Sequence, residues 1–305
     1  MESYTSDYHT PVLWRESVEL LNIAEEGGVY CDLTFGGGGH TRLILSNLGK
    51  EGRVYSFDQD LDTKANIPDD ERFNYVESNF RFLRGALRLR GVESVDGILA
   101  DLGVSSHHFD AKERGFSFRG DAPLDMRMNQ RGKITAAEVV NRYSNEELTR
   151  VLGEWGEVQT PWKVANCICR AREVSPITTT AELVAAIAPC TPKAAESKFL
   201  TKVFQGLRIE VNGEMEALKM ALEQSLKVLR PGGRLVVISY HSLEDRLVKN
   251  FFRSGNFSGE VERDFYGKSS TPWEVVTRKA VAPSSEEQQQ NPRSRSAKMR
   301  AATKL

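Results

Sequence analysis

A run of four consecutive glycines, residues 36–39, constrains this chain more than any other feature. It follows an apolar segment that predicts a buried strand over residues 29–35, and it precedes a predicted helix over 43–48. A strand, a glycine loop and a helix in this order let the backbone pass close beneath a ligand. Asp58 ends the next predicted strand, where a carboxylate can hold both hydroxyls of a ribose. The sequence therefore predicts a nucleoside cofactor at the carboxyl edge of a parallel sheet.

The spacing of the glycines argues against the cofactors that carry a pyrophosphate. In the dinucleotide fingerprint G-x-G-x-x-G/A, counting from Gly36 puts Thr41 where glycine or alanine is required. The phosphate loop also fails, because Gly49-Lys50 is followed by Glu51 rather than by Ser or Thr. A glycine loop with neither fingerprint favours S-adenosylmethionine. The alternative is a glycine-rich turn without a ligand, although four successive glycines are entropically unfavourable to order.

The composition indicates a globular protein. The chain has 305 residues, of which 40% are hydrophobic and 27% are charged. No apolar run approaches the roughly 18 residues that span a membrane, and the N-terminus lacks the basic and apolar blocks of a signal peptide. The four cysteines form no C-x-x-C pair, which predicts reduced thiols and a cytoplasmic location. A zinc site made by Cys167, Cys169 and a histidine is a weaker alternative.

Basic side chains are concentrated in two places although the net charge is only -1. The first cluster spans residues 81–90 and contains no acid; its members are Arg81, Arg84, Arg88 and Arg90. The second lies in the tail over residues 291–300; its members are Arg293, Arg295, Lys298 and Arg300. Such clusters suit a nucleic-acid backbone, but they also suit a solvated face. The tail has a further alternative, an edge strand whose arginines pair with nearby acids.

The order of predicted elements indicates an α/β fold. Strands are predicted at residues 29–35, 53–58, 73–77, 95–101, 234–240 and 274–281. Helices are predicted at residues 43–48, 136–143, 145–153, 162–172, 181–188, 194–210, 214–229 and 242–253. The early alternation of strands and helices predicts a Rossmann-like, doubly wound parallel sheet. Residues 108–209 have no strand pattern and are predicted to form an inserted all-helical subdomain, between parts of a cofactor domain at 1–107 and 210–305. Residues 283–291 are predicted to be a mobile polar linker.

Two loops that leave predicted strands carry candidate reactive groups. Asp101 ends the fourth strand, so we expect it at the same rim as the glycine loop and Asp58. His241 follows the strand at 234–240 and belongs to the same rim. The alternatives are a helix-capping acid and a structural histidine. Residues 123–128, an acid and a base between two methionines, look like a lid or a substrate loop, although methionine at such spacing more often packs.

Seven motifs resemble those of one bacterial family. They are FGGGGH at 35–40, DLGVSS at 101–106, RGFSF at 114–118, PLDMRM at 123–128, FQGLRI at 204–209, SYHSLEDR at 239–246 and NPRSRS at 291–296, and HTPVL at 9–13 matches the family's N-terminal signature. The family is the small-subunit (16S) ribosomal RNA methyltransferase that methylates N4 of a decoding-centre cytidine. The resemblance covers essentially the whole chain.

The resemblance implies the fold, the cofactor and the site. The fold is the class I methyltransferase sheet with a helical insertion that helps to form the RNA site, and the cofactor is S-adenosyl-L-methionine. The implied cofactor contacts are Gly38, Gly39, His40, Asp58, Phe80, Asp101 and His108. One contact departs from the family pattern Ser-Ser-Pro-Gln, because His108 stands where the family has glutamine. Imidazole offers one hydrogen bond there in place of the paired pattern of an amide.

The implied reaction needs alignment and a proton acceptor. The exocyclic amine of cytosine is a poor nucleophile, so the enzyme must hold the amine, methyl group and sulfur in line. The candidate proton acceptors are Asp101, the carbonyls of the loop that follows it, and His241. The expected partner is 16S ribosomal RNA, within the small subunit and with the target base out of its stack, and no membrane. A nicotinamide dehydrogenase and a non-catalytic RNA-binding assembly factor with a vestigial cofactor site are the competing interpretations.

Overall fold

The computed structural model describes residues 11–103, 112–261 and 270–305. The predicted contact His108 lies outside these residues. The chain divides into two compact units, of which unit 1 comprises residues 1–103 and 215–305 and unit 2 comprises residues 104–214. The insertion predicted at 108–209 lies a few residues inside the limits of unit 2.

Unit 1 is built on a seven-stranded sheet in the order β3-β2-β1-β4-β5-β7-β6. The strands are β1 (Val29–Asp32), β2 (Arg53–Asp58), β3 (Phe73–Glu77), β4 (Val95–Asp101), β5 (Leu229–Ser239), β6 (Trp273–Val275) and β7 (Lys298–Lys304). Strands β1 to β5 pair in parallel, and β7 runs antiparallel to both of its neighbours. The predicted α/β class with a doubly wound parallel sheet is confirmed, and β7 and β6 extend the sheet on one side through antiparallel pairing.

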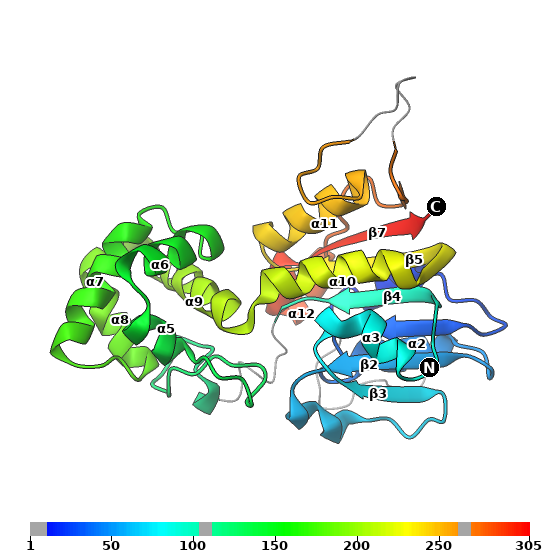
Figure 1. Ribbon diagram of the computed structural model, residues 1–305, viewed down its shortest axis with the longest axis horizontal. Coiled ribbons are helices and arrows are strands. Elements are labelled where there is room, and N and C mark those ends of the chain that lie inside the picture. Colours follow the sequence, from blue (N-terminus) through cyan, green and yellow to red (C-terminus); the bar gives the residue numbers. More distant parts are fainter. Residues whose placement is uncertain (1–10, 104–111, 262–269) are drawn as a thin grey trace. The chain divides into compact units, whose positions relative to one another are not determined.

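Helices pack on the sheet through apolar stripes. Unit 1 contains α1 (Trp14–Leu21), α2 (Gly39–Asn47), α3 (Leu83–Arg88), α10 (Glu214–Val228), α11 (Ser242–Ser254) and α12 (Ser285–Gln290). Shorter turns are η1 (Leu61–Asn66), η2 (Phe80–Phe82) and η7 (Pro292–Ser296). Helix α10 runs along β4 and β5 with α3 beside it (Figure 1). It buries Leu218, Leu222 and Ser225, residues spaced by three or four positions as one helix face requires.

The predicted mobile linker at 283–291 is wrong, because this segment forms α12. The Ser284 hydroxyl caps the helix by accepting a hydrogen bond from the Glu287 amide, and Glu286 and Glu287 occupy the first turn, where carboxylates are favourable. The Glu287 carboxylate accepts a hydrogen bond of 2.8 Å from the amide of Leu13. The polar composition of this segment did not reveal the helix. Through Glu287, the helix connects a late part of the chain to Leu13, near its start.

The basic tail is an interior part of the sheet. Strand β7 lies between β5 and β6, so the expectation of an edge strand is wrong, while the expected pairing of its cations with an acid is confirmed. Arg300 Nε lies 2.7 Å from Asp245 Oδ1, and Lys298 Nζ lies 3.5 Å from Asp245 Oδ2. Both cations therefore have a structural partner on α11. Arg293 and Arg295 remain exposed in η7.

The late strand predicted at 274–281 is shorter than expected. Strand β6 ends at Val275, and Val281 is joined to Met299 by an isolated bridge. The amides of Val276 and Thr277 both donate to the carbonyl of Ala301. Two successive residues then oppose one residue of β7, which interrupts a regular ladder.

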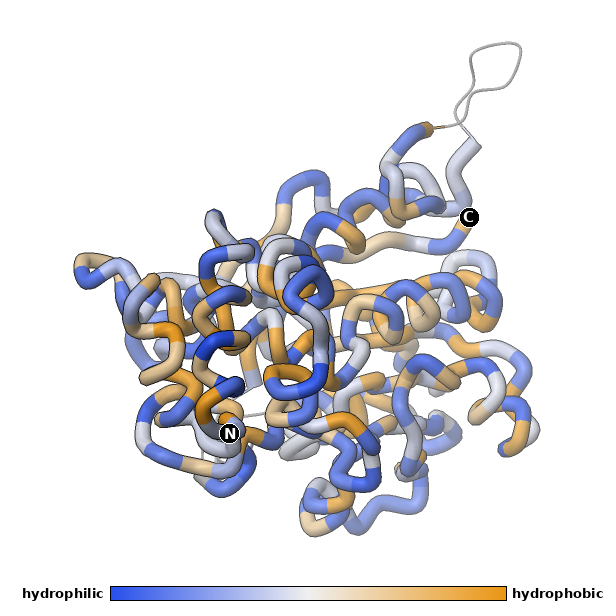
Figure 2. Tube along the Cα trace, turned by 60° about the vertical axis from the view of Figure 1, so that its left-hand side comes forward, coloured by the Kyte–Doolittle hydropathy of each residue, from blue (hydrophilic) through white to orange (hydrophobic). Residues whose placement is uncertain are grey.

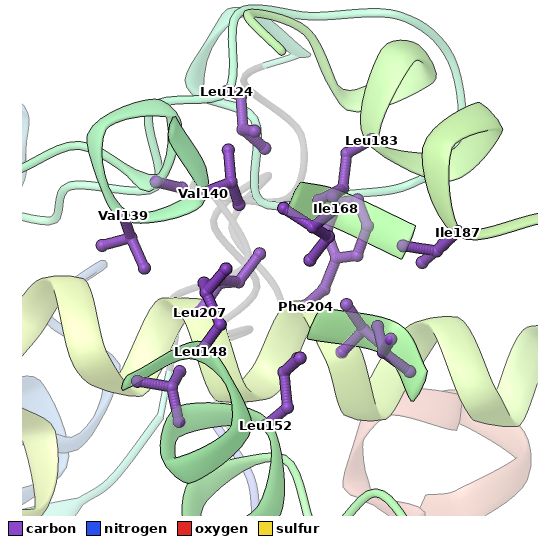
Figure 3. Close-up of a cluster of buried hydrophobic side chains, with 14 of the residues drawn as sticks. Leu124, Val139, Val140, Leu148, Leu152, Ile168, Leu183, Ile187, Phe204 and Leu207 are labelled. Carbon is purple, nitrogen blue, oxygen red and sulfur yellow. The ribbon is translucent and has the colours of Figure 1, made fainter. Parts of the chain in front are cut away.

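Among the residues that the structure describes, unit 2 contains helices and no strand, apart from an isolated bridge between Pro123 and Thr179. Its helices are α5 (Ala136–Arg142), α6 (Asn145–Arg150), α7 (Pro161–Val174), α8 (Thr180–Ile187) and α9 (Glu196–Asn212), with a π-helical turn η4 (Val151–Trp155) and short turns η3 (Lys112–Arg114), η5 (Ala188–Cys190) and η6 (Lys193–Ala195). Capping boxes at Thr135, Ser144 and Thr179 start α5, α6 and α8. Figure 3 shows side chains of these helices converging on one apolar core, among them Val140, Leu148, Leu152, Ile168, Leu183, Phe204 and Leu207.

The FQGLRI motif at 204–209 has a packing role in unit 2. A Cβ on Gly206 would lie 3.0 Å from the backbone nitrogen of Gly156, so the motif's glycine lets α9 approach the π-helical turn. The Gln205 amide donates to the carbonyl of Trp155 at 2.9 Å. Glu210, one residue beyond the motif, accepts a hydrogen bond of 2.8 Å from the Trp155 indole. These contacts fix the turn against α9.

The segment 123–128, interpreted as a lid or a substrate loop, contributes Leu124 and Met126 to the core of unit 2. The interpretation as a lid is wrong, and the packing alternative for its methionines is confirmed. Met126 is fully buried and adopts the left-handed conformation with φ 61°. The Asp125 carboxylate and the Arg127 guanidinium form two hydrogen bonds of 2.9 and 2.6 Å. The side chain of Asn212 accepts from the amide of Met128 and donates to the carbonyl of Met126. A segment anchored at so many points cannot open as a lid.

Among the described residues, no helix is both long enough and apolar enough to cross a membrane. Figure 2 shows hydrophilic and hydrophobic residues alternating at short intervals along the chain. The four cysteines are all free thiols.

The Asp245 cluster gives a stability prediction. Burial acts to raise the pKa of Asp245, but hydrogen bonding to Arg300 and the charges of Arg300 and Lys298 outweigh it and hold the pKa below its ordinary value. Asp245→Asn should lower the free energy of unfolding at pH 7 by roughly 2–4 kcal/mol, because it leaves a largely buried guanidinium without its counter-charge. Because the folded-state pKa is lowered, the wild-type advantage should be present above about pH 4 and should fade as the pH falls below it.

Urea titrations between pH 3 and pH 7 measure both effects. Glu223→Gln, which removes an exposed acid on α10, is the control and should change stability by less than about 0.5 kcal/mol. Equal stability of the Asp245→Asn protein and the wild type at pH 7 would contradict a structural role for this cluster.

Candidate active site

The glycine loop begins at a buried carboxylate. Asp32 at the end of β1 is fully buried, and its Oδ1 accepts a hydrogen bond of 3.0 Å from the amide of Thr34. Its Oδ2 accepts a hydrogen bond of 2.7 Å from the hydroxyl of Thr41 in the first turn of α2. Asp32 thus connects β1 to α2 across the loop. Its hydrogen bonds offset the free-energy cost of burying the carboxylate.

Two glycines of the loop have conformations that other residues rarely adopt. Gly36 and Gly38 have φ of 50° and 74°. Gly39, the first residue of α2, is required for space, because a Cβ there would lie 2.3 Å from Cγ of Pro11. The loop therefore needs glycine for backbone shape at two positions and for contact with the N-terminal segment at a third.

Asp58 holds the glycine loop from the neighbouring strand. Its Oδ2 accepts a hydrogen bond of 2.8 Å from the amide of Gly36, and its Oδ1 accepts one of 2.8 Å from the amide of Asp60. Asp58 sits at the end of β2 as predicted, and it contacts the loop directly.

Asp101 is the centre of a three-residue network on the other side of the loop. Its Oδ1 accepts a hydrogen bond of 2.8 Å from the hydroxyl of Tyr240, which follows β5. Its Oδ2 lies 3.6 Å from Nδ1 of His40. His40 Nε2 lies 3.0 Å from the carbonyl oxygen of Val12. A carbonyl can only accept, so Nε2 carries a proton, and Nδ1 can donate to Asp101 only when the ring is an imidazolium. Asp101 and His40 can therefore share one further proton.

The protonation of this network is set mainly by burial. Burial raises the pKa of Asp101 to about 6, although the charge of His40 and the hydrogen bond from Tyr240 both act to lower it. Burial and the neighbouring Asp101 raise the pKa of Tyr240 well above its ordinary value. The phenol consequently stays protonated and donates, while Asp101 changes its charge close to physiological pH.

His241 is engaged by the helix that it begins. It is the N-cap residue of α11, and its Nδ1 accepts a 3.5 Å hydrogen bond from the amide of Glu244. Its Nε2 lies 3.1 Å from the Glu244 carboxylate. Both ring nitrogens face Glu244, which gives His241 a capping role. The catalytic role predicted for His241 stays a prediction that this geometry does not favour.

Phe80 and the sheet order complete the rim. Phe80 begins η2 just beyond β3 and lies with Leu33 and Leu102 around a small apolar cavity. Because β1 lies between β2 and β4, the glycine loop is flanked by the ends of the strands that carry Asp58 and Asp101. This is the switch point at which α/β sheets bind ligands.

The structure adds one polar side chain that the sequence did not single out, the phenol of Tyr240. Its hydroxyl bond to Asp101 joins β5 to β4 across a sequence separation of 139 residues, so no local pattern could reveal it. The only sequence signal was its position next to His241 in the SYHSLEDR motif.

The chain matches the model of the MraW methylase family over residues 6–305. The chain belongs to this family. Curated relatives named "Ribosomal RNA small subunit methyltransferase H" include one from Parabacteroides distasonis, 55% identical and covering 100% of both chains, and one from Bacteroides thetaiotaomicron, 53% identical and also covering 100% of both. A solved ribosomal RNA methylase from Streptococcus thermophilus is 12% identical with a TM-score of 0.42 and covers 96% of this chain and 93% of that one.

This MraW family member is a methyltransferase, and its cofactor is S-adenosyl-L-methionine. The rim suits that cofactor chemically: it combines a glycine loop that has two positive-φ glycines with two carboxylates and an aromatic ring. A nicotinamide dehydrogenase is excluded by the family membership.

A prediction concerns the close contact at Gly39. Gly39→Ala should destabilise the protein by about 1–3 kcal/mol, because the new methyl group overlaps Pro11 and the loop or the N-terminal segment must move. Gly85→Ala on α3 is the matched control: a Cβ there meets nothing within 4 Å among the described residues, so helix propensity should raise stability by up to about 1 kcal/mol. Thermal melts compare the two, and a Gly39→Ala protein as stable as the wild type would refute the packing argument.

A second prediction concerns the titration of Asp101. Affinity for S-adenosylhomocysteine should fall as the pH decreases through about 6, because protonation removes the charge and an acceptor from Asp101. The Asp101→Asn protein should bind more weakly at pH 8 and show a flatter profile between pH 5 and 8. Calorimetric titration over this range measures both.

The same pKa has an opposite consequence for stability. A pKa raised by folding means that the folded state holds the proton more tightly than the unfolded state does. The contribution of Asp101 to stability should therefore decline as the pH rises from about 4 to about 6, and this decline should vanish in Asp101→Asn. A parallel pH dependence in both proteins would assign the titration to another group.

Proposed function

We propose that this protein transfers the methyl group of S-adenosyl-L-methionine to N4 of the decoding-centre cytidine, nucleotide 1402, of 16S ribosomal RNA. The observation that carries the proposal is a glycine loop held between Asp58 and Asp101, in a chain that matches relatives named small-subunit ribosomal RNA methyltransferases over its full length. The substrate is the RNA within the small subunit, which places the enzyme in the cytoplasm. No observation favours a non-catalytic assembly factor with a vestigial cofactor site.

The proposed cofactor contacts follow the rim. Asp58 accepts the ribose hydroxyls, the backbone at Gly38 and Gly39 passes beneath the cofactor, and Phe80 supplies an apolar surface. His40 contacts the cofactor, and Asp101 either contacts it or accepts the proton, because one carboxylate cannot hold a cofactor amine and act freely as a base at the same time. His108 lies outside the described residues and remains a proposal from the family resemblance alone. S-adenosyl-L-methionine supplies a methyl group that its sulfonium already activates.

The protein's own contribution is alignment and proton handling. Holding the amine in line with the methyl group can supply roughly 7–11 kcal/mol of the barrier. Of the two side chains predicted to accept the proton, Asp101 is the better supported. Its pKa of about 6 makes it a carboxylate at neutral pH with a raised affinity for a proton, whereas His241 faces Glu244. Tyr240 and His40 keep Asp101 in place.

Unit 2 is proposed to recognise the RNA. It is inserted directly after the Asp101 strand and before α10, so the substrate-specific part of the chain begins where the reactive rim ends. Its described residues form a complete helical core of their own, and they are not needed to build the sheet of unit 1.

The test uses small subunits from a strain that lacks this gene. Incubation with the wild-type protein and cofactor should produce N4-methylcytidine at nucleotide 1402, detected by mass spectrometry of the RNA fragment. Asp101→Ala should lower the rate by at least about 100-fold, a typical loss for a proton-transfer or positioning group. Glu223→Gln should leave it unchanged. Methylation at another nucleotide, or none with a protein that binds the cofactor, would refute the proposal; protein-free 16S RNA in a parallel reaction identifies the assembly state required.

A further inference from the structure

Helix α3 presents a row of arginines on the exposed side of unit 1. The helix buries Leu83, Ala86 and Leu87 against the domain, and its other side chains face outward. Arg84 and Arg88, four residues apart, lie on one exposed face, and Arg81 precedes them by one turn. Residues 78–92 contain no acid. Arg84 and Arg88 of the basic cluster therefore share one exposed face.

The two exposed arginines have no counter-charge among the residues that the structure describes. Neither Arg84 nor Arg88 forms an ion pair within the described part of the chain. Like charges at this spacing destabilise a helix. Gln224 of α10 holds the segment through its backbone, accepting from the amide of Arg84 at 2.9 Å and donating to the carbonyl of Arg81. The backbone is thus anchored while the guanidinium groups stay available for an anion.

An apolar row runs beside the arginines. Phe82 is 55% exposed and Leu89 is 87% exposed, and Gly85 lies between them. Glycine inside a helix is less stable than alanine, and a Cβ on Gly85 would meet nothing within 4 Å among the described residues. The packing of the described chain therefore gives no reason for glycine here. Close approach of a ligand's backbone is a reason that glycine commonly serves.

We propose that the exposed face of η2 and α3 binds the backbone of the substrate RNA, with Arg84 and Arg88 on phosphates and Phe82 against an unpaired base. This inference rests on the proposed function, and it places an RNA contact on the cofactor domain in addition to unit 2. Arginine forks match phosphate oxygens, and aromatic rings stack on bases that have left a helix. The face begins two residues after Phe80, so RNA bound along it leads to the cofactor rim.

The test is the salt dependence of binding to unmethylated small subunits. Arg84→Gln/Arg88→Gln removes two charges and leaves shorter, polar side chains that can still form hydrogen bonds. Loss of two phosphate contacts should flatten the log–log slope of affinity against salt by about 1.4 to 1.8 and weaken binding at low salt by roughly ten- to fiftyfold. Affinity for S-adenosylhomocysteine should stay unchanged. The matched control is Lys249→Gln/Arg253→Gln on α11, two exposed cations at the same spacing, which should keep the wild-type slope.

A second variant tests close approach without removing charge. Gly85→Leu favours the helix and adds bulk only on the exposed face, so the protein should melt no lower than the wild type yet bind small subunits at least about fivefold more weakly. An unchanged salt slope in the arginine variant, an equal change in the α11 control, or unchanged binding by Gly85→Leu would each overturn the proposal.

The proposed RNA-binding face and the proposed methylation target can be refuted independently of each other. If the wild-type protein binds subunits with the expected slope but methylates a different nucleotide, the RNA face stands and the proposed target falls. If nucleotide 1402 is methylated by the arginine variant with wild-type affinity and slope, the RNA face falls and the proposed function stands.

Discussion

The fully buried carboxylate of Asp32 is the interaction on which the rest of the site depends. It joins the end of β1 to the first turn of α2 through Thr34 and Thr41. Thr34 in turn accepts a hydrogen bond of 2.8 Å from the amide of Asp101, so the same carboxylate fixes the end of β4. A charge in such a place is tolerated because its hydrogen bonds are made within the fold. These hydrogen bonds hold the segments on both sides of the glycine loop.

Burial and hydrogen bonding control different properties of Asp101. Burial sets its pKa, and its polar neighbours set the orientation of its carboxylate. Burial moves its pKa to about 6, so the group is poised to change charge near neutral pH. Tyr240 and His40 then fix the direction of each carboxylate oxygen. Holding one carboxylate from two sides is what a site needs when alignment supplies most of the rate. The same arrangement explains why a tyrosine outside the glycine loop belongs to the reactive rim.

Two basic clusters of similar composition have different environments. In the tail, Lys298 and Arg300 lie in an interior strand and share Asp245, so their charges contribute to the fold. On α3, Arg84 and Arg88 lie on an exposed face whose backbone is held by Gln224. Charge counts cannot separate these cases, because the difference is whether an acid from a distant segment reaches the cation. The α11 helix supplies such an acid to β7.

Local patterns in the sequence determined most of the elements and the rim. The glycine loop, the acids at the ends of β2 and β4, and the capped helices of unit 2 follow from backbone preferences and hydrogen bonding within a few residues. The sequence also carried the family resemblance, which implied the cofactor. It misjudged α12 and the segment at 123–128, because a polar composition resembles a linker and a methionine pair resembles a lid until their partners are known.

Tertiary structure alone decided which distant groups meet. It paired Tyr240 with Asp101, Glu287 with the amide of Leu13, and Asp245 with Arg300. Each partnership spans more than 50 residues, so no neighbour along the chain selects it. Sequence fixes what a residue can donate or accept within its own turn or strand. The fold decides which distant donor and acceptor groups lie within hydrogen-bonding distance of each other.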